Sequence, residues 1–174
     1  FAEIVRESDD AYEKDVDDAA AKILQSRDDL RLVIIAGPSS SCKTTTTAKL
    51  GERLTATGVS LVALNVDNYF YDLEVHPRDE YGDYDFETPQ ALDLALINEH
   101  LQRLIDGEEV MIPYYDFKTG RRHNDATPMQ IRGDQMILID SLHGLYEGMT
   151  TAIPPSQKFR LYIETLLQMK GPDN

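Results

Sequence analysis

The residues best suited to chemistry form a short run of small, hydroxyl-bearing and basic side chains, Gly37-Pro-Ser-Ser-Ser-Cys-Lys-Thr44. The run matches the phosphate-loop pattern G-x-x-x-x-G-K-[ST] at every fixed position except the second glycine, where this chain has Cys42. Successive backbone N–H groups of such a loop surround phosphate oxygens, and the helix that follows adds the positive end of its dipole. The run therefore predicts a nucleotide site.

Within this loop, two side chains have predicted roles of their own. Lys43 would place a positive charge on the β- and γ-phosphates, and the Thr44 hydroxyl would bind Mg²⁺. The predicted nucleotide-binding residues are Gly37, Pro38, Ser39, Ser40, Ser41, Cys42, Lys43, Thr44 and Thr45. The alternative is a Gly-Pro turn followed by a Ser/Thr helix cap and an ordinary surface lysine.

Cys42 is the departure that bears most on the loop. Glycine is used where φ is positive or where the backbone must approach a ligand closely. A Cβ atom in the left-handed region costs about 1–2 kcal/mol. We therefore expect a loop that binds ATP more weakly than an intact one, or a damaged loop.

The flanking segments predict the strand and the helix that a phosphate loop needs. Residues 31–36 form an apolar run typical of a buried parallel strand, and residues 44–54 fit a helix with one apolar face. Further strands are predicted at 59–66, 110–117, 129–132, 136–139 and 159–164, and further helices at 10–26 and 89–105. This alternation predicts an α/β fold with a doubly wound parallel sheet and flanking helices. Two of the strands, joined by the basic turn 118–122, would add a small β-hairpin.

Two aspartates come directly after predicted strands. Asp67 follows the run 59–66, and Asp140 follows the run 136–139. Ligands of such sheets bind at the carboxyl ends of the strands, so one cleft would hold both acids and the loop. Asp140 would hold Mg²⁺ directly or through water, and Asp67 would accept the proton of an attacking hydroxyl. The alternatives are a solvated strand end for Asp140 and a plain aromatic core around Asp67.

Length and charge limit the class of protein. The chain has 174 residues, enough for one domain with a real core, and a formal net charge of −14, which disfavours nucleic acid and anionic membranes as partners. Its single cysteine excludes an internal disulfide and is typical of a reducing cytoplasm. The N-terminus is acidic and unlike a signal peptide, and no apolar run approaches the roughly 20 residues of a membrane span. The start at Phe1 predicts a processed or excised piece.

Five blocks of the sequence together resemble the uridine kinase and phosphoribulokinase family. The blocks are Gly37–Thr45, Asp67–Phe70, Tyr84–Pro89, Ile112–Phe117 and Ile139–Leu145, and they occur in the family order. The chain is most similar to bacterial uridine-kinase-like proteins over about residues 32–164. The resemblance implies a P-loop kinase domain at 30–174, preceded by an acidic helical segment at 1–29 that packs on the core. It also implies ATP and Mg²⁺ as cofactors, and phosphoryl transfer to a small-molecule hydroxyl, most simply the 5′-hydroxyl of a nucleoside.

The resemblance also implies roles for single residues. Asp67 matches the acid that deprotonates the nucleoside 5′-hydroxyl, and Asp140 matches the metal-linked acid at a strand end. Glu87 matches a carboxylate that holds ribose hydroxyls, as a carboxylate acceptor can. Tyr115 and Phe117 match aromatic residues around the base, where flat rings would form walls. The acceptor side would thus lie on the hairpin and on the segment after Asp67.

Departures from the family pattern leave other functions open. Asp140-Ser141 replaces Glu-Gly, and Gly120 stands about where uridine–cytidine kinases have a base-reading histidine. The chain ends at Asn174, before the family's arginine-rich lid, last strand and helix. One alternative is a kinase for another alcohol, such as a sugar phosphate or pantothenate. The other is a catalytically impaired nucleotide-binding or regulatory module of the same fold. A homo-oligomer is open in every case.

Overall fold

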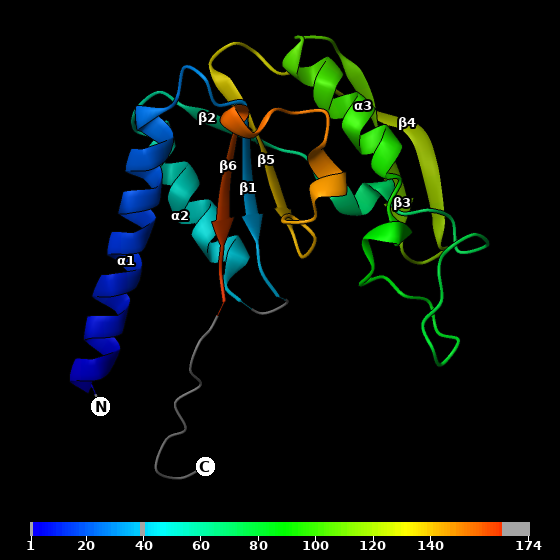
Figure 1. Ribbon diagram of the computed structural model, residues 1–174, viewed down its shortest axis with the longest axis horizontal. Coiled ribbons are helices and arrows are strands. Elements are labelled where there is room, and N and C mark those ends of the chain that lie inside the picture. The colour runs from blue at the N-terminus through cyan, green and yellow to red at the C-terminus, as the bar shows by residue number, and fades with distance from the viewer. Residues whose placement is uncertain (1, 39–40, 165–174) are drawn as a thin grey trace.

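The computed structural model describes residues 2–38 and 41–164, and a four-stranded parallel sheet forms its centre. The strands are β1 (Leu32–Ala36), β2 (Ser60–Ala63), β5 (Gln135–Ser141) and β6 (Lys158–Tyr162). They lie in the order β2-β5-β1-β6, and neighbouring strands run parallel (Figure 1). The predicted α/β fold with a doubly wound parallel sheet is confirmed.

The two inner strands are almost continuously apolar because both faces of the sheet are covered. All five residues of β1 are buried, and Met136–Ile139 of β5 are buried as well. Parallel strands covered on both faces read as unbroken hydrophobic runs. The two strands pair in register, with Ile34 opposite Ile139.

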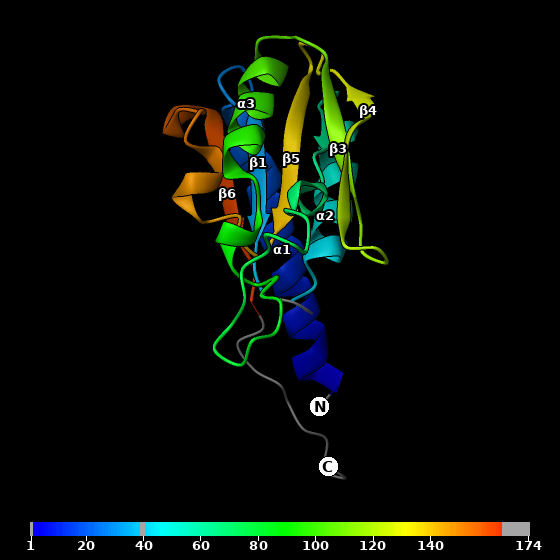
Figure 2. The same ribbon diagram turned by 90° about the vertical axis from the view of Figure 1, so that its right-hand side faces the viewer.

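Helices and a hairpin cover the two faces of the sheet separately (Figures 1 and 2). On one face lie α1 (Ala2–Gln25) and α2 (Lys43–Thr55), which share a core with Val33 and Ile35. On the other lie α3 (Leu94–Ile105) and the antiparallel hairpin of β3 (Val110–Asp116) and β4 (Arg121–Met129), which share a core with Ile34 and Ile139. Short 3-10 helices occupy Val66–Tyr69, Pro89–Ala91, Glu147–Thr150 and Pro155–Gln157.

Helix α1 is longer than its apolar pattern predicts. The pattern starts at residue 10, whereas the helix begins at Ala2. Val16, Ala19 and Ile23 are buried on the core, but residues 3–11 are exposed. The added turns are rich in Glu and other helix formers, which extend a helix without burying a face.

The predicted second hairpin strand is wrong. We expected it at 129–132 after a turn at 118–122, but β4 spans Arg121–Met129 and pairs Asp116 with Arg121. Nearly every side chain of β4 is exposed or only half-buried, so the strand carries no apolar pattern. Its pairing with β3 determines where it lies.

The predicted helix 89–105 is split into two parts. Pro89 begins a 3-10 turn that ends at Ala91, and α3 begins only at Leu94. The Asp93 side chain caps α3 by accepting a hydrogen bond from the Leu96 N–H at 3.1 Å. A 3-10 turn and a separate α-helix thus stand where one continuous helix was predicted. Across residues 2–38 and 41–164, no helix has both the length and the apolar character needed to cross a membrane.

Candidate functional site

The predicted phosphate loop connects the carboxyl end of β1 to the start of α2, at the lower edge of the sheet in Figure 1. Of its predicted residues, Ser39 and Ser40 lie outside the described part of the chain. Gly37 packs directly against the backbone that follows β6, because a Cβ on Gly37 would lie 2.1 Å from the Ile163 carbonyl oxygen. Only glycine allows this close approach of two backbones.

Cys42 adopts the left-handed conformation expected at this position of the pattern. It is the residue before α2, with φ 64° and ψ 21°, and its thiol is exposed. Its side chain makes no capping hydrogen bond, so the first N–H groups of α2 have no side-chain acceptor at this residue. This end of the helix is therefore suited to an anion.

Two polar groups of the loop also fit a phosphate. The Ser41 hydroxyl is buried without a hydrogen-bond partner among the described residues. The Lys43 ammonium turns back and donates to the Pro38 carbonyl at 2.7 Å. A buried unpaired hydroxyl and a folded-back lysine would both gain from an anion in the loop. The residues present thus fit the polyphosphate of a nucleotide.

Asp67 and Asp140 both lie near the carboxyl ends of strands, although β2 ends at Ala63, before the predicted end at residue 66, and β5 continues past Asp140 to Ser141. Asp67 lies in the 3-10 turn after β2, where its N–H donates to the Asn65 side chain at 3.0 Å. Asp140 is the penultimate residue of β5 and accepts a hydrogen bond from the Thr47 hydroxyl at 3.5 Å. The topology therefore brings both acids to the edge of the sheet that carries the loop.

The electrostatics of the two carboxyl groups show that they share one environment. Burial raises the pKa of Asp140, while the Lys43 ammonium and the Thr47 hydroxyl lower it. Solvent reaches the Asp67 side chain, yet desolvation by the surrounding protein raises its pKa; His143 lowers that pKa and Asp140 raises it. The Lys43 ammonium thus acts on Asp140, and the Asp140 carboxylate acts on Asp67.

A metal ion would need ligands beyond the carboxylates. No group of three or more His, Cys, Asp or Glu side chains suited to a metal occurs in the described segments. Mg²⁺ is usually held by one or two carboxylates together with substrate phosphates and water. Asp140 and the exposed Thr44 hydroxyl in the first turn of α2 fit that arrangement with a nucleotide present.

His143 is a candidate functional residue to which the sequence pattern assigns no role. It is half-buried, and burial lowers its pKa, whereas the Phe86 backbone and the carboxylates of Asp67, Asp85 and Glu87 raise it. One imidazole therefore lies within electrostatic reach of the predicted base Asp67 and of the predicted acceptor-binding residue Glu87. The sequence signals were its place three residues after Asp140 and within the family-like block Ile139–Leu145.

The two aromatic residues predicted to surround a base have different environments. Tyr115 is only 2% exposed and packs among Phe70, Phe86 and Phe117. The centre of its ring lies 4.9 Å from the centre of the Phe117 ring. Phe117 is 62% exposed at the rim of this cluster. Phe117 alone presents an open surface, and Tyr115 supports it from the core.

Gly120 is fixed by the hairpin turn and by a neighbouring side chain. It has φ 66°, and its N–H donates to the Asp116 carbonyl at 2.7 Å. A Cβ at this position would lie 2.1 Å from Leu73 Cδ1. Leu73 therefore fills the space that a side chain of residue 120 would occupy.

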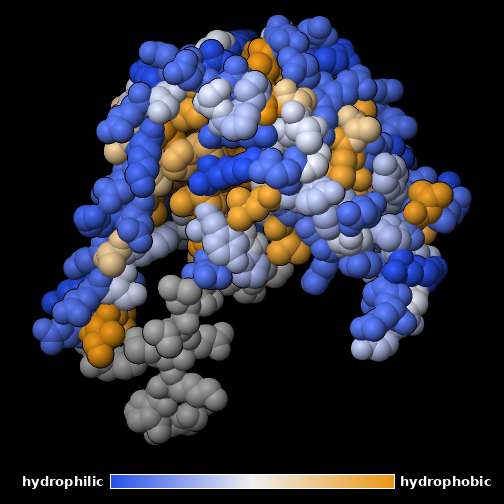
Figure 3. All heavy atoms as spheres, viewed as in Figure 1, coloured by the Kyte–Doolittle hydropathy of each residue, from blue (hydrophilic) through white to orange (hydrophobic). Residues whose placement is uncertain are grey.

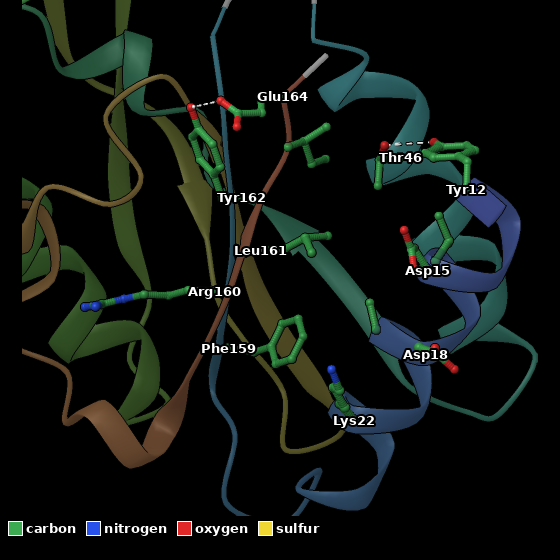
Figure 4. Close-up of a pocket in the computed structure, with 13 residues that line it drawn as sticks. Tyr12, Asp15, Asp18, Lys22, Thr46, Phe159, Arg160, Leu161, Tyr162 and Glu164 are labelled. Carbon is green, nitrogen blue, oxygen red and sulfur yellow. Dashed lines mark hydrogen bonds between the residues drawn. The ribbon is translucent and has the colours of Figure 1, made fainter. Parts of the chain in front are cut away.

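A large groove lies away from these residues, between α1 and the edge strand β6 (Figure 4). It encloses about 460 Å³, and hydrophobic atoms gather in the hollow beside α1 (Figure 3). The groove contains none of the predicted site residues. It does contain Thr46, one turn into the helix that follows the loop.

Comparisons with known proteins identify related sequences and a related fold. A model of the Phosphoribulokinase / Uridine kinase family matches residues 32–170. Uridine kinases of Oceanobacillus iheyensis and Deinococcus deserti are each 31% identical, over 108 and 113 residues that cover 62% and 65% of this chain. These matches cover 50% and 53% of the relatives, so the chain spans about half the length of these curated proteins.

Among solved structures, one described as a possible uridine kinase from Bacillus stearothermophilus shares the fold. It has a TM-score of 0.65 at 20% identity and covers 84% of this chain and 78% of its own. Helix α1 lies wholly outside the residues matched by the family model.

Proposed function

Because this chain belongs to the phosphoribulokinase and uridine kinase family, we propose that it binds ATP·Mg²⁺ and transfers the γ-phosphoryl group to a small-molecule hydroxyl. The acceptor that fits best is the 5′-hydroxyl of a nucleoside. One observation carries the proposal: the phosphate loop, Asp140 and Asp67 come together at the carboxyl edge of one parallel sheet. Ligands of open α/β sheets bind at this edge.

The loop would hold the nucleotide by its backbone and by Lys43. When ATP binds, the Lys43 ammonium would leave the Pro38 carbonyl, to which it donates at 2.7 Å, for the β- and γ-phosphates. The Ser41 hydroxyl, buried without a partner in the described chain, would donate to a phosphate oxygen. Mg²⁺, held by Thr44 and Asp140, would neutralise charge on the transferring phosphoryl group.

Asp67 would accept the proton of the acceptor hydroxyl. A general base is most effective when its pKa lies near the working pH, and desolvation moves the pKa of Asp67 upward toward that range. Lys43 lies near Asp140, and Asp140 lies near Asp67. This order supports Asp67 as the proton acceptor, with the acceptor hydroxyl approaching the γ-phosphate from the Asp67 side.

Glu87 and Phe117 would bind the rest of the acceptor. Glu87 is exposed near His143 and would accept hydrogen bonds from ribose hydroxyls. The exposed ring of Phe117 would stack on a base. Since Leu73 covers Gly120, no polar side chain at that point of the hairpin would read the edge of the base. We therefore infer loose discrimination among bases.

Cys42 favours one second candidate, a nucleotide-binding module that has lost turnover. Its Cβ occupies a left-handed position at the mouth of the phosphate site. Such a module would bind ATP·Mg²⁺ without consuming it.

A panel of acceptors separates these functions. The assay is ATP consumption by the whole chain with ribonucleosides, their 2′-deoxy counterparts, sugar phosphates and pantothenate, together with calorimetric binding of ATP·Mg²⁺. We expect consumption with several ribonucleosides and less with each 2′-deoxy form, since Glu87 would lose a donor. Consumption with a sugar phosphate or pantothenate alone would reassign the acceptor, binding without consumption would indicate the module, and absence of binding would refute both.

A further inference from the structure

Helix α1, which lies outside the family match, is attached along the helix that follows the phosphate loop (Figure 1). The Glu13 carboxylate pairs with Lys49 and, at 2.6 Å, with Arg53 of α2; Asp17 also pairs with Arg53. The Lys49 ammonium lies 4.9 Å from the centre of the Tyr12 ring. These contacts fix α1 on α2 without touching the loop.

A hydrogen-bond relay continues from α1 to the loop itself. The Tyr12 hydroxyl lies 2.8 Å from Thr46 Oγ1, as Figure 4 shows at the end of the groove. Thr46 Oγ1 donates to the Cys42 carbonyl at 3.1 Å, and the Thr46 N–H donates to the same carbonyl at 3.0 Å. A threonine hydroxyl has a single hydrogen. Tyr12 must therefore donate to Thr46, and Thr46 to Cys42.

The end point of this relay controls a peptide group of the phosphate site. In a trans peptide the C=O and the N–H point in opposite directions, so holding the Cys42 carbonyl along α2 directs the Lys43 N–H toward the loop. The left-handed conformation carries a steric cost for Cys42, so the hydrogen bonds to its carbonyl favour the observed conformation over the alternatives. Strained backbone persists only where its surroundings hold it.

We propose that Tyr12 is a positioning residue that acts through Thr46 to hold the Cys42–Lys43 peptide in its phosphate-binding orientation. The inference rests on the proposed binding of ATP·Mg²⁺ by this loop. Thr46 is 2% exposed, so a water that replaced the Tyr12 hydroxyl as donor would have to enter from the groove that both residues line. An added helix thereby becomes part of the nucleotide site although it touches no nucleotide.

The test compares Tyr12→Phe with Glu13→Gln. The first removes the donor and keeps the ring over Lys49, and the second weakens the attachment of α1 while leaving the relay intact. The measurements are the dissociation constant of ATP·Mg²⁺, kcat, the acceptor KM, the melting temperature and the exchange rate of the Thr46 amide hydrogen.

We expect Tyr12→Phe to weaken ATP·Mg²⁺ binding about three- to tenfold, the loss from one partly buried hydrogen bond. The exchange of the Thr46 amide without nucleotide should rise by a similar factor, while kcat and the acceptor KM stay unchanged. Glu13→Gln should lower the melting temperature without changing the affinity for ATP·Mg²⁺. Placed in a Cys42→Gly background, Tyr12→Phe should weaken binding less than about twofold, because glycine needs no support in the left-handed region.

Three results would overturn the proposal. One is unchanged Thr46 exchange and unchanged affinity in Tyr12→Phe. Another is an equal loss of affinity in Glu13→Gln, which would show that α1 acts only by packing. The third is the same loss with and without Cys42→Gly. If the unaltered chain binds no ATP·Mg²⁺, the proposed function fails, and the exchange of the Thr46 amide still decides whether the relay holds Cys42.

Discussion

Replacing Cys42 by glycine is expected to stabilise the fold, although it removes a side chain. The residue has φ 64° and ψ 21°, where a Cβ atom costs about 1–2 kcal/mol. The thiol is exposed and caps no N–H group, so its removal loses little in the folded state. Relief of this strain is therefore the main contribution by which glycine would raise the free energy of unfolding.

The opposing term lies in the unfolded chain. Glycine has more conformations to lose on folding, which costs about 0.4–1 kcal/mol. Subtracting this from the relieved strain gives a gain between roughly 0 and 1.6 kcal/mol in the free energy of unfolding. For a domain of this length, the middle of that range raises the melting temperature by about 2–3 °C.

Urea unfolding under reducing conditions measures this gain, and Cys42→Ala is the matched control. Alanine keeps the Cβ and removes only the thiol, so it should leave the midpoint nearly unchanged. The m value should be the same in all three proteins, because the surface exposed on unfolding is the same. Equal stabilisation by alanine and glycine, or a loss of more than about 0.5 kcal/mol with glycine, would refute the account of strain at this residue.

The remaining predictions concern the base and the core. Asp67→Asn should lower kcat by about 10²–10⁴-fold with little change in the affinity for ATP·Mg²⁺. The control is Asp134→Asn, at a residue that lies just before the start of β5, far along the strand from Asp140, and it should change neither kcat nor that affinity. The proton-accepting form of Asp67 is lost as pH falls through its raised pKa; the acid limb of kcat/KM should therefore lie above the ordinary aspartate pKa of 3.8 and disappear in Asp67→Asn. The Tyr69 hydroxyl forms a buried hydrogen bond with His100 Nδ1 at 2.8 Å. Tyr69→Phe removes this partner and should lower the free energy of unfolding in urea by about 1–3 kcal/mol. An unchanged unfolding midpoint would show that the bond contributes nothing to stability.

The sequence was sufficient where the signal is local. Strand β1, the loop and α2 follow one another within 24 residues, and each has its own pattern: an apolar run, a phosphate-loop motif and an amphipathic helix. The parallel sheet was predictable for the same reason, because β1 and β5 are buried on both faces.

The hairpin shows where local pattern was insufficient. Strand β4 is exposed along most of Arg121–Met129. It therefore owes its formation to hydrogen bonding with β3, because it buries little apolar surface. The pairing register shifts between Ile112 and Tyr114, around a proline that has no N–H to donate. This irregularity turns Tyr115 toward the core, and no alternation in the sequence shows it. Phe117 lies beyond the end of β3, in the turn, and is exposed.

The relation among the site residues was predictable only in part. Two acids at strand ends imply one cleft, because the carboxyl ends of parallel strands meet at one edge. The place of His143 near both Asp67 and Glu87 depends on how the turn after β5 and the segment 72–88 pack together. Such packing involves contacts between distant parts of the chain, and no single motif contains it.

Cys42 connects the family pattern to the part of the chain that lies outside it. A residue with a Cβ at φ 64° favours other conformations when nothing holds it. Here the Cys42 carbonyl receives two hydrogen bonds from Thr46, and Thr46 is held in turn by Tyr12 of α1. The cysteine at the glycine position and helix α1 are therefore connected by one set of hydrogen bonds. A phosphate loop without the freedom of glycine at this position depends on the surrounding protein to hold its conformation, and in our proposal α1 provides that support from outside the residues that the family model matches.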